Sequence, residues 1–316
     1  MSLFLLKRLA IFAATLAGAS IVVFLVLEVL PGDAAQTILG STATPEAVAA
    51  LRHKLGLDQP AAARYLAWVG GMMRGEFGTS YAYGVPVADL LRQSLAVTLP
   101  LALIAMALNA ALGLAAGVYA ASRHNRAGDV GVMALSQVGI AVPNFWLAIM
   151  LVLLFSVTLR WLPAGGFPGW GAGAWPALRA LILPAVSLSL VQAAVLARTS
   201  RSAALEVARE DFVRTARAKG LSRGQALRRH VLRNAMIPIV TIMGLQLSNL
   251  VVLTIVVENV FSLPGLGQLV FKAIANRDLV VVRDVVMLLA ALVVTVNLLT
   301  DLLYLAIDPR LKAADL

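Results

Sequence analysis

Residues able to carry out chemistry are few in this 316-residue chain, and they are scattered. The chain has no cysteine, and its three histidines, His53, His124 and His230, lie far apart in the sequence. This composition argues against a disulfide framework, a metal site and a resident cofactor. None of the five lysines follows a glycine, so the Gly-Lys pair of an ATP-binding phosphate loop is absent. No serine–histidine–aspartate set or pair of carboxylates stands out, and we expect a protein that is not itself an enzyme.

Polar residues inside long apolar runs are the next candidates, because polar groups are costly in lipid and are often functional there. Nine residues lie in or at the edges of such runs: Glu28, Asn109, Gln137, Asn144, Gln192, Gln246, Asn249, Asn297 and Asp301. Gln246 and Asn249 are spaced i, i+3 on one helical face and are the predicted lining of a solute pathway. The alternative for each amide is a hydrogen bond between helices. We see no series of carboxylates at mid-depth that would suit a proton relay.

The richest polar segment runs from Ser200 to Pro238. Ser202 to Ala218 is rich in helix-forming Ala, Arg, Glu and Leu and predicts one helix. Gly220 suits the left-handed turn that ends a helix. Ser222 and Gln225 fit a capping box, which begins a second helix that runs toward Pro238. The segment therefore predicts two short helices joined at a sharp glycine turn.

Small side chains make this turn slim enough to enter a groove on a partner, and basic side chains surround it. The predicted partner-contacting residues are Arg214, Thr215, Ala216, Arg217, Ala218, Lys219 and Gly220. The alternative is an ordinary basic loop held at the lipid headgroups. That alternative explains the charge but not the length, since the loop of residues 198–235 is far longer than the usual connection of about 2–8 residues between helices.

The elements that must position these residues are membrane helices. The chain is 60% hydrophobic and 13% charged, with a mean hydropathy of +0.87, which leaves too little polar surface for a soluble protein. A membrane span takes about 20 helical residues. Six runs meet or approach this length: Leu9 to Leu27, Gln93 to Ser122, Val130 to Leu159, Ala180 to Ala197, Asn234 to Val257 and Val285 to Ile307. We expect an all-α membrane protein with six transmembrane helices.

Two features of these runs leave alternatives open. The first run has a basic start, but it is longer than the apolar region of about 7–15 residues in a cleaved signal peptide, so we expect it to remain. Pro100, Pro143, Pro184 and Pro238 fall in or at the runs and predict either fixed kinks or hinges for alternating access.

The distribution of positive charge predicts the orientation. If both termini are cytoplasmic, 16 of the 26 Lys and Arg residues lie in cytoplasmic segments and 10 in the much longer outer segments. The positive-inside rule therefore places both termini and the loop 198–235 in the cytoplasm, and the segment 31–92 outside. The net charge of +10 then faces anionic lipid or a cytoplasmic partner, and no nucleic acid is needed to explain it.

The motifs resemble those of permeases from bacterial binding-protein-dependent ABC importers, in particular the dipeptide, oligopeptide and nickel branch. That family carries a cytoplasmic Glu-Ala-Ala-x3-Gly loop, whose Gly aligns with Gly220, although Arg214 and Thr215 replace the consensus Glu and first Ala. The runs DFVRTARAKGLS and RHVLRNAMIP fit the peptide branch better than the general consensus. Further matching stretches follow in order along the chain: Leu30-Pro31-Gly32-Asp33, residues 55–60, residues 75–80 and residues 258–267.

The resemblance implies a single permease domain over residues 1–316 in the bacterial inner membrane, with 198–235 as a cytoplasmic coupling loop. It implies a second homologous permease subunit, two cytoplasmic ATPase subunits and a periplasmic substrate-binding protein as partners, with di- or oligopeptides as substrate. Nickel chelates and glutathione remain open as substrates. An ion-coupled secondary transporter is the rival function, and a scaffold of a membrane complex is the third. The lack of mid-membrane carboxylates argues against the ion-coupled transporter.

Overall fold

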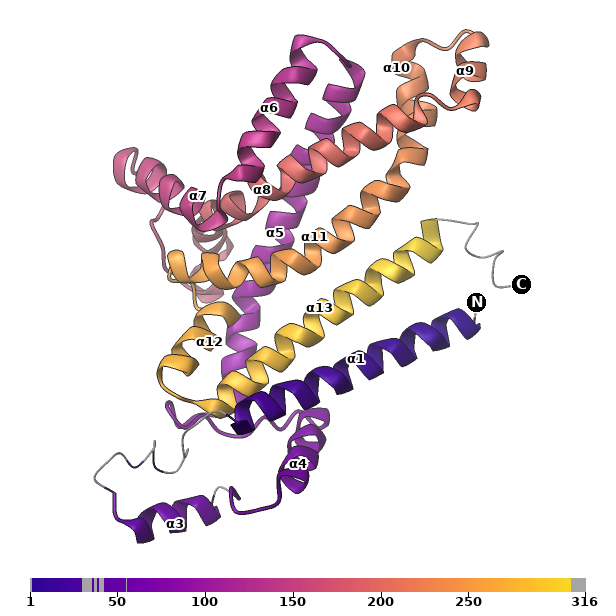
Figure 1. Ribbon diagram of the computed structural model, residues 1–316. Helices are drawn as coiled ribbons and strands as arrows, with labels where there is room; N and C mark the ends of the chain where they lie inside the picture. Colours follow the sequence, from indigo (N-terminus) through magenta and orange to yellow (C-terminus); the bar gives the residue numbers. More distant parts are fainter. Residues whose placement is uncertain (1, 30–35, 37–38, 40–42, 55, 308–316) are drawn as a thin grey trace. The chain divides into compact units, whose positions relative to one another are not determined.

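A computed structural model describes residues 2–29, 36, 39, 43–54 and 56–307. Within these ranges the regular elements are helices, apart from one isolated bridge between Thr79 and Pro86 (Figure 1). The Leu30–Asp33 motif, Leu55 and the side chain of Glu28 lie outside the described residues.

Long apolar helices dominate the chain, as its hydropathy predicts. Five helices are long and apolar enough to cross a membrane alone: α1 (Ser2–Val29), α5 (Val87–Ser122), α8 (Ala174–Val207), α11 (Leu232–Val260) and α13 (Leu279–Ile307). A sixth crossing comes from α6 (Ala127–Ala141) and α7 (Asn144–Leu151) if this bent pair counts as one span. The predicted all-helical membrane class is confirmed.

The third predicted span, Val130 to Leu159, is not one straight helix. The chain bends by 101° between α6 and the helical run that starts at Asn144 and continues as the π-helical segment η1 (Val152–Thr158). Pro143 causes the break, because its ring disfavours helical backbone at the preceding residue, and Val142 is extended with φ −85° and ψ 123°. Pro100, Pro184 and Pro238 instead lie inside α5, α8 and α11, where the helices continue through them.

Contacts divide the chain into two compact units. The described part of the larger unit comprises residues 99–263 and 295–307, and that of the smaller unit comprises the described residues among 2–98 and 264–294. In the larger unit α8 is the central helix. It packs against α11, α6 and α7, and 67% of the residues in its apolar stretch are buried.

Glycines allow α5 to approach α8 closely in the larger unit. A Cβ at Gly117 would lie 2.5 Å from the carbonyl oxygen of Ala197, and one at Gly113 would lie 2.7 Å from the Cβ of Leu196. Gly113 and Gly117 form a G-x-x-x-G pair, a spacing that suits close packing of membrane helices.

In the smaller unit, Trp68 packs with Phe24 of α1 and Met287 of α13. α3 (Pro45–Lys54) and α4 (Ala61–Met73) lie in the predicted outer segment. The apolar helix α12 (Leu266–Ala275) follows the Pro-Gly turn and buries one face. Asp278 joins the outer segment to α13, because its Oδ2 accepts hydrogen bonds from Ser80 Oγ at 2.5 Å and from the backbone N–H of Ala82 at 3.1 Å.

Candidate functional site

The loop between α8 and α11 folds as a short helical hairpin (Figure 1). Its first helix is α9 (Asp211–Ala218) and its second is α10 (Arg223–Ala226), and we call residues 208–226 the α9–α10 hairpin. The single helix predicted over Ser202–Ala218 is wrong, because α8 ends at Val207 and Glu210 is extended at φ −63° and ψ 147°. The break turns α9 so that Val213 packs on Ala121 and Ala204, a tertiary contact that helix propensity cannot report.

The local signals of the hairpin turn are confirmed. Gly220 has φ +95°, a conformation that costs a residue with a side chain about 1 kcal/mol or more. Ser222 Oγ accepts from the backbone N–H of Gln225, and the Gln225 side chain accepts from the backbone N–H of Ser222, which completes the capping box. From Arg223 the helix continues through the π-helical segment η3 (Leu227–Val231) directly into α11.

The predicted partner-contacting residues divide between two faces of the hairpin. Ala216 is buried with Val213 in this chain. The exposed members of the set are Arg214, Thr215, Arg217, Ala218, Lys219 and Gly220.

Phe212 was missed by the sequence reasoning. Its side chain is 44% exposed at the start of α9. The signal for it was the amphipathic pattern of α9, in which Phe212 flanks the face that buries Val213 and Ala216.

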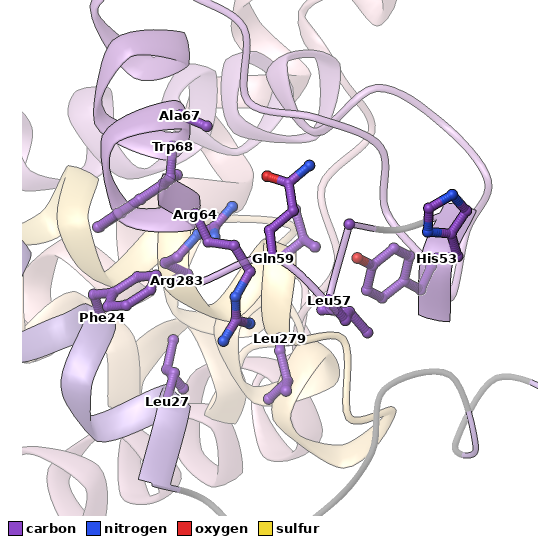
Figure 2. Close-up of a pocket in the computed structure, with 13 residues that line it drawn as sticks. Phe24, Leu27, His53, Leu57, Gln59, Arg64, Ala67, Trp68, Leu279 and Arg283 are labelled. Atoms are coloured by element: carbon purple, nitrogen blue, oxygen red, sulfur yellow. The ribbon is translucent and has the colours of Figure 1, made fainter. Parts of the chain in front are cut away.

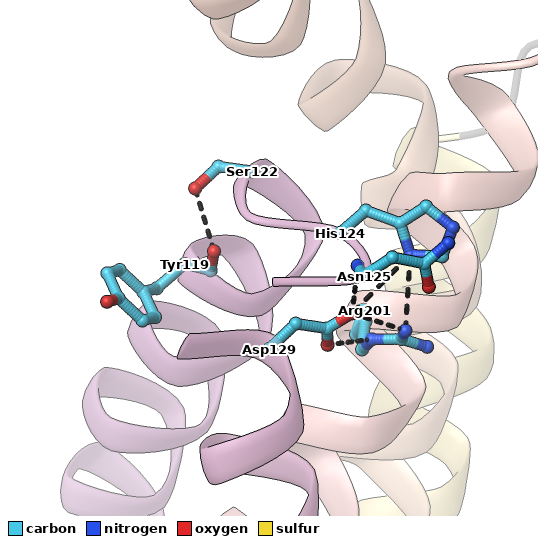
Figure 3. A network of polar contacts seen from close by, with 6 residues as sticks. All are labelled: Tyr119, Ser122, His124, Asn125, Asp129 and Arg201. Carbon is cyan, nitrogen blue, oxygen red and sulfur yellow. Dashed lines mark hydrogen bonds and ion pairs between the residues drawn. The ribbon is translucent and has the colours of Figure 1, made fainter. Parts of the chain in front are cut away.

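A buried ion pair fixes the membrane end of the hairpin (Figure 3). Arg201, near the end of α8, donates from Nε and Nη2 to the two carboxylate oxygens of Asp129 at 2.5 and 2.7 Å. The backbone N–H of Asn125 donates to the same carboxylate at 2.9 Å, and His124 Nδ1 lies 3.2 Å from Arg201 Nη2. Because Asp129 begins α6, this cluster joins the α5–α6 turn to α8 just before the hairpin. The sequence reasoning did not identify it, since its members are far apart in sequence.

The predicted pathway residues have different surroundings. Gln246 is only 4% exposed and accepts from Asn109 Nδ2 at 2.9 Å, while its own Nε2 donates to the Gln192 carbonyl at 2.9 Å. This triad joins α5, α8 and α11, as the interhelical alternative predicted. Asn249 is exposed in this chain and is the member of the pair that remains available to line a pathway. No group of three His, Cys, Asp or Glu side chains suited to a metal ion occurs among the residues that the structure describes.

Comparisons with known proteins give a consistent result along the chain. Residues 113–313 match the family described as "Binding-protein-dependent transport system inner membrane component", and residues 1–102 match the N-terminal model of the same transport systems. A putative peptide transport system permease protein of Brucella abortus is 41% identical over 99% of both chains. The dipeptide transport system permease protein of Alkalihalophilus pseudofirmus is 36% identical over 97% of this chain and 98% of its own.

The chain is also similar to a permease named for glutathione transport and to a solved transporter structure. The glutathione transport system permease protein of Salmonella choleraesuis is 39% identical over 98% of both chains. Among solved structures, an inward-facing MetNI methionine ABC transporter chain is similar with a TM-score of 0.57 at 22% identity, covering 69% of this chain and 96% of that one. At that identity the likeness shows the fold alone.

Proposed function

The chain belongs to the family of binding-protein-dependent transport system inner membrane components, and we propose that it forms half of a pathway for short peptides. It is a multi-pass inner-membrane permease of an ABC importer. Membership of this family, whose transport depends on a binding protein, favours the ABC importer over the rival ion-coupled transporter.

The relatives support peptides as the substrate class. Proteins named for peptide, dipeptide and glutathione transport are 36 to 41% identical to this chain over nearly its whole length. These names share one chemistry, a short chain of amino acids joined by amide bonds. We therefore infer a di- or oligopeptide substrate, with glutathione as the alternative.

The exposed side of the α9–α10 hairpin is the proposed docking element for two ATPase subunits. It presents the half-exposed ring of Phe212 together with the exposed basic side chains of Arg214, Arg217 and Lys219. Aromatic and arginine side chains are enriched at protein interfaces. The chain lacks a phosphate loop, so the energy for import is proposed to come from these separate subunits, and a second homologous permease completes the pathway.

The proposed orientation places both termini and the hairpin in the cytoplasm. It is supported by the 16 to 10 distribution of Lys and Arg between the two sets of segments. Because the chain has no cysteine, a single Cys at position 225 reports the side directly. Labelling by an impermeant reagent from the cytoplasmic side is expected, and labelling from the periplasm would reverse the orientation.

The coupling proposal is tested at Gly220. An added Cβ there meets no atom within 4 Å, so a side chain would project from the turn toward a docked partner. Gly220→Trp is expected to abolish co-purification of the ATPases and substrate uptake in reconstituted vesicles, while the permease still inserts in the membrane. Phe212→Ala is expected to weaken ATPase binding about tenfold, because aromatic side chains at interface centres commonly contribute more than about 1 kcal/mol.

Gly75→Trp is the matched control. Gly75 also has a positive φ, of +80°, and also has no atom within 4 Å of an added Cβ, but it lies in the proposed periplasmic segment. It is expected to leave ATPase binding unchanged. If Gly220→Trp keeps both ATPase binding and uptake at the wild-type level, the hairpin is not the coupling element.

A further inference from the structure

A pocket to which the proposed function assigns no role lies within the smaller unit (Figure 2). Its volume is about 480 Å³, and it is lined by the end of α1, by α4 and the segment before it, and by the first turns of α13. Figure 2 shows Arg64 of α4 and Arg283 of α13 beside the rings of Phe24 and Trp68. Two guanidinium groups from separate helices therefore reach one cavity.

Anion binding is favoured by the charges that line this pocket. In the described part of the chain, its ionisable lining residues are Arg64, Arg283, His53 and Tyr81, and none is acidic, although His53 is paired with Asp58 at 2.6 Å. The nearest carboxylate to Arg283 is Asp284, whose Oδ1 lies 3.6 Å from Arg283 Nε and accepts from Trp68 Nε1 at 2.7 Å. Asp284 is fully buried behind Arg283 and is not among the lining residues, so it holds the guanidinium without filling the cavity.

The guanidinium of Arg283 is held in place by an aromatic ring. Its Cζ lies 4.7 Å from the centre of the Trp68 ring, a cation–π contact that orients the flat face of the group. Trp68 in turn packs with Phe24 at 6.2 Å between ring centres. A guanidinium that is positioned in advance loses little conformational freedom when it binds phosphate oxygens.

The position of the pocket along the membrane spans indicates that the anion is a lipid headgroup. Leu27 and Leu279, both in the lining, are the last residue of the apolar span of α1 and the first residue of the span of α13. The pocket is therefore at the boundary between hydrocarbon and water, where phospholipid headgroups lie. Beside it, α1 exposes Val22, Leu25 and Val26 in its last turns, each more than half accessible in this chain.

We propose that this pocket binds the phosphate headgroup of an anionic phospholipid, with Arg64 and Arg283 as its ligands. The acyl chains would follow the exposed apolar face of α1. Arginine guanidinium groups are common ligands of phosphate oxygens. The site shares no residue with the α9–α10 hairpin. Variants of Arg64 therefore test lipid binding alone, and variants of Gly220 and Phe212 test the coupling proposal.

The test measures lipid binding to the full-length chain in detergent by native mass spectrometry. Dioleoyl phosphatidylglycerol is expected to bind more tightly than dioleoyl phosphatidylcholine. Arg64→Gln is expected to reduce the affinity for phosphatidylglycerol about fivefold, as for the loss of one basic residue near an anionic headgroup. Arg64→Lys keeps the charge and is expected to retain most of the preference, which controls for a fault in folding.

Arg74→Gln is the matched control. Arg74 follows α4, is 66% exposed, pairs with Glu76 at 3.2 Å and does not line the pocket. It is expected to leave the lipid preference unchanged. Equal affinity of the wild-type chain for the two lipids, or an unchanged preference in Arg64→Gln, would overturn the proposal. Displacement of phosphatidylglycerol by millimolar sn-glycerol 3-phosphate would also overturn it, because the site would then select a free anion over a lipid.

Discussion

Two arginines in different units of the molecule have contrasting surroundings. Arg214 is exposed on the α9–α10 hairpin of the larger unit, whereas Arg283 lies beside a buried carboxylate in the smaller unit. On the hairpin, Arg214 is 74% exposed and its partner Asp211 is 94% exposed, at 3.3 Å. In the smaller unit, Arg283 is 24% exposed and Asp284 is fully buried. Water solvates the first pair whether or not it forms, whereas the second carboxylate relies on protein groups for its stabilisation. The hairpin charges are therefore free to meet a partner, while Arg283 is also required by the fold.

The largest effect is expected from breaking the Arg283–Asp284 pair. Arg283→Met leaves Asp284 buried without its cation and should lower the free energy of unfolding by about 3 kcal/mol. Arg214→Met on the hairpin should change it by less than about 0.5 kcal/mol. The measurement is denaturant-induced unfolding of the purified chain in micelles.

The comparison is sharpened by removing both charges. Arg283→Met combined with Asp284→Leu should recover part of the lost stability, because no unpaired buried carboxylate remains but Trp68 Nε1 loses its acceptor. Equal effects of Arg283→Met and Arg214→Met would show that burial does not distinguish the two arginines.

An intermediate effect is expected at Arg201, which is 21% exposed against an Asp129 side chain that is 3% exposed. Arg201→Met should cost about 2 kcal/mol in the same assay, because it removes two hydrogen bonds to a charged group while Asn125 still donates one. Arg198→Met is the control, since Arg198 lies on the same helix and is exposed. A loss in Arg201→Met no larger than in Arg198→Met would mean that the cluster does not hold the membrane end of the hairpin.

The smallest effect concerns His53 and Asp58, an exposed pair in the outer segment at 2.6 Å. The hydrogen bond to Asp58 raises the pKa of His53 above its ordinary 6.5, and the same bond lowers the pKa of Asp58 below its ordinary 3.8. The His53 contribution to stability is fully present below pH 6.5 and is lost as the pH rises through the raised pKa. The Asp58 contribution is present above pH 3.8 and is lost as the pH falls through the lowered pKa.

The pair is therefore strongest at a pH between the lowered pKa of Asp58 and the raised pKa of His53. Asp58→Asn should bring the pKa of His53 back toward 6.5, as measured by NMR titration, with little change in stability because both groups are exposed. An unchanged His53 titration in that variant would show that the pair does not form in solution.

Features that depend on neighbouring residues could be predicted from the sequence. The apolar runs located the membrane helices, because lipid demands long stretches without charge. Gly220 has the positive φ that a helix-ending glycine takes, and Ser222 and Gln225 form the predicted capping box, because both depend on residues within one turn. The family could be identified because its motifs are short stretches of sequence that occur in the same order along this chain.

Tertiary structure decided the features that join distant residues. Arg201 and Asp129 are 72 positions apart, and Asn109 and Gln246 are 137 apart, so local patterns could not show that either pair meets. Four prolines looked alike in sequence, yet the helix is broken at Pro143 with a bend of 101°, while the helices around Pro100, Pro184 and Pro238 continue. Packing also turned Ala216 inward and left Phe212 exposed, because the contacts of α9 with the ends of other helices select the buried face.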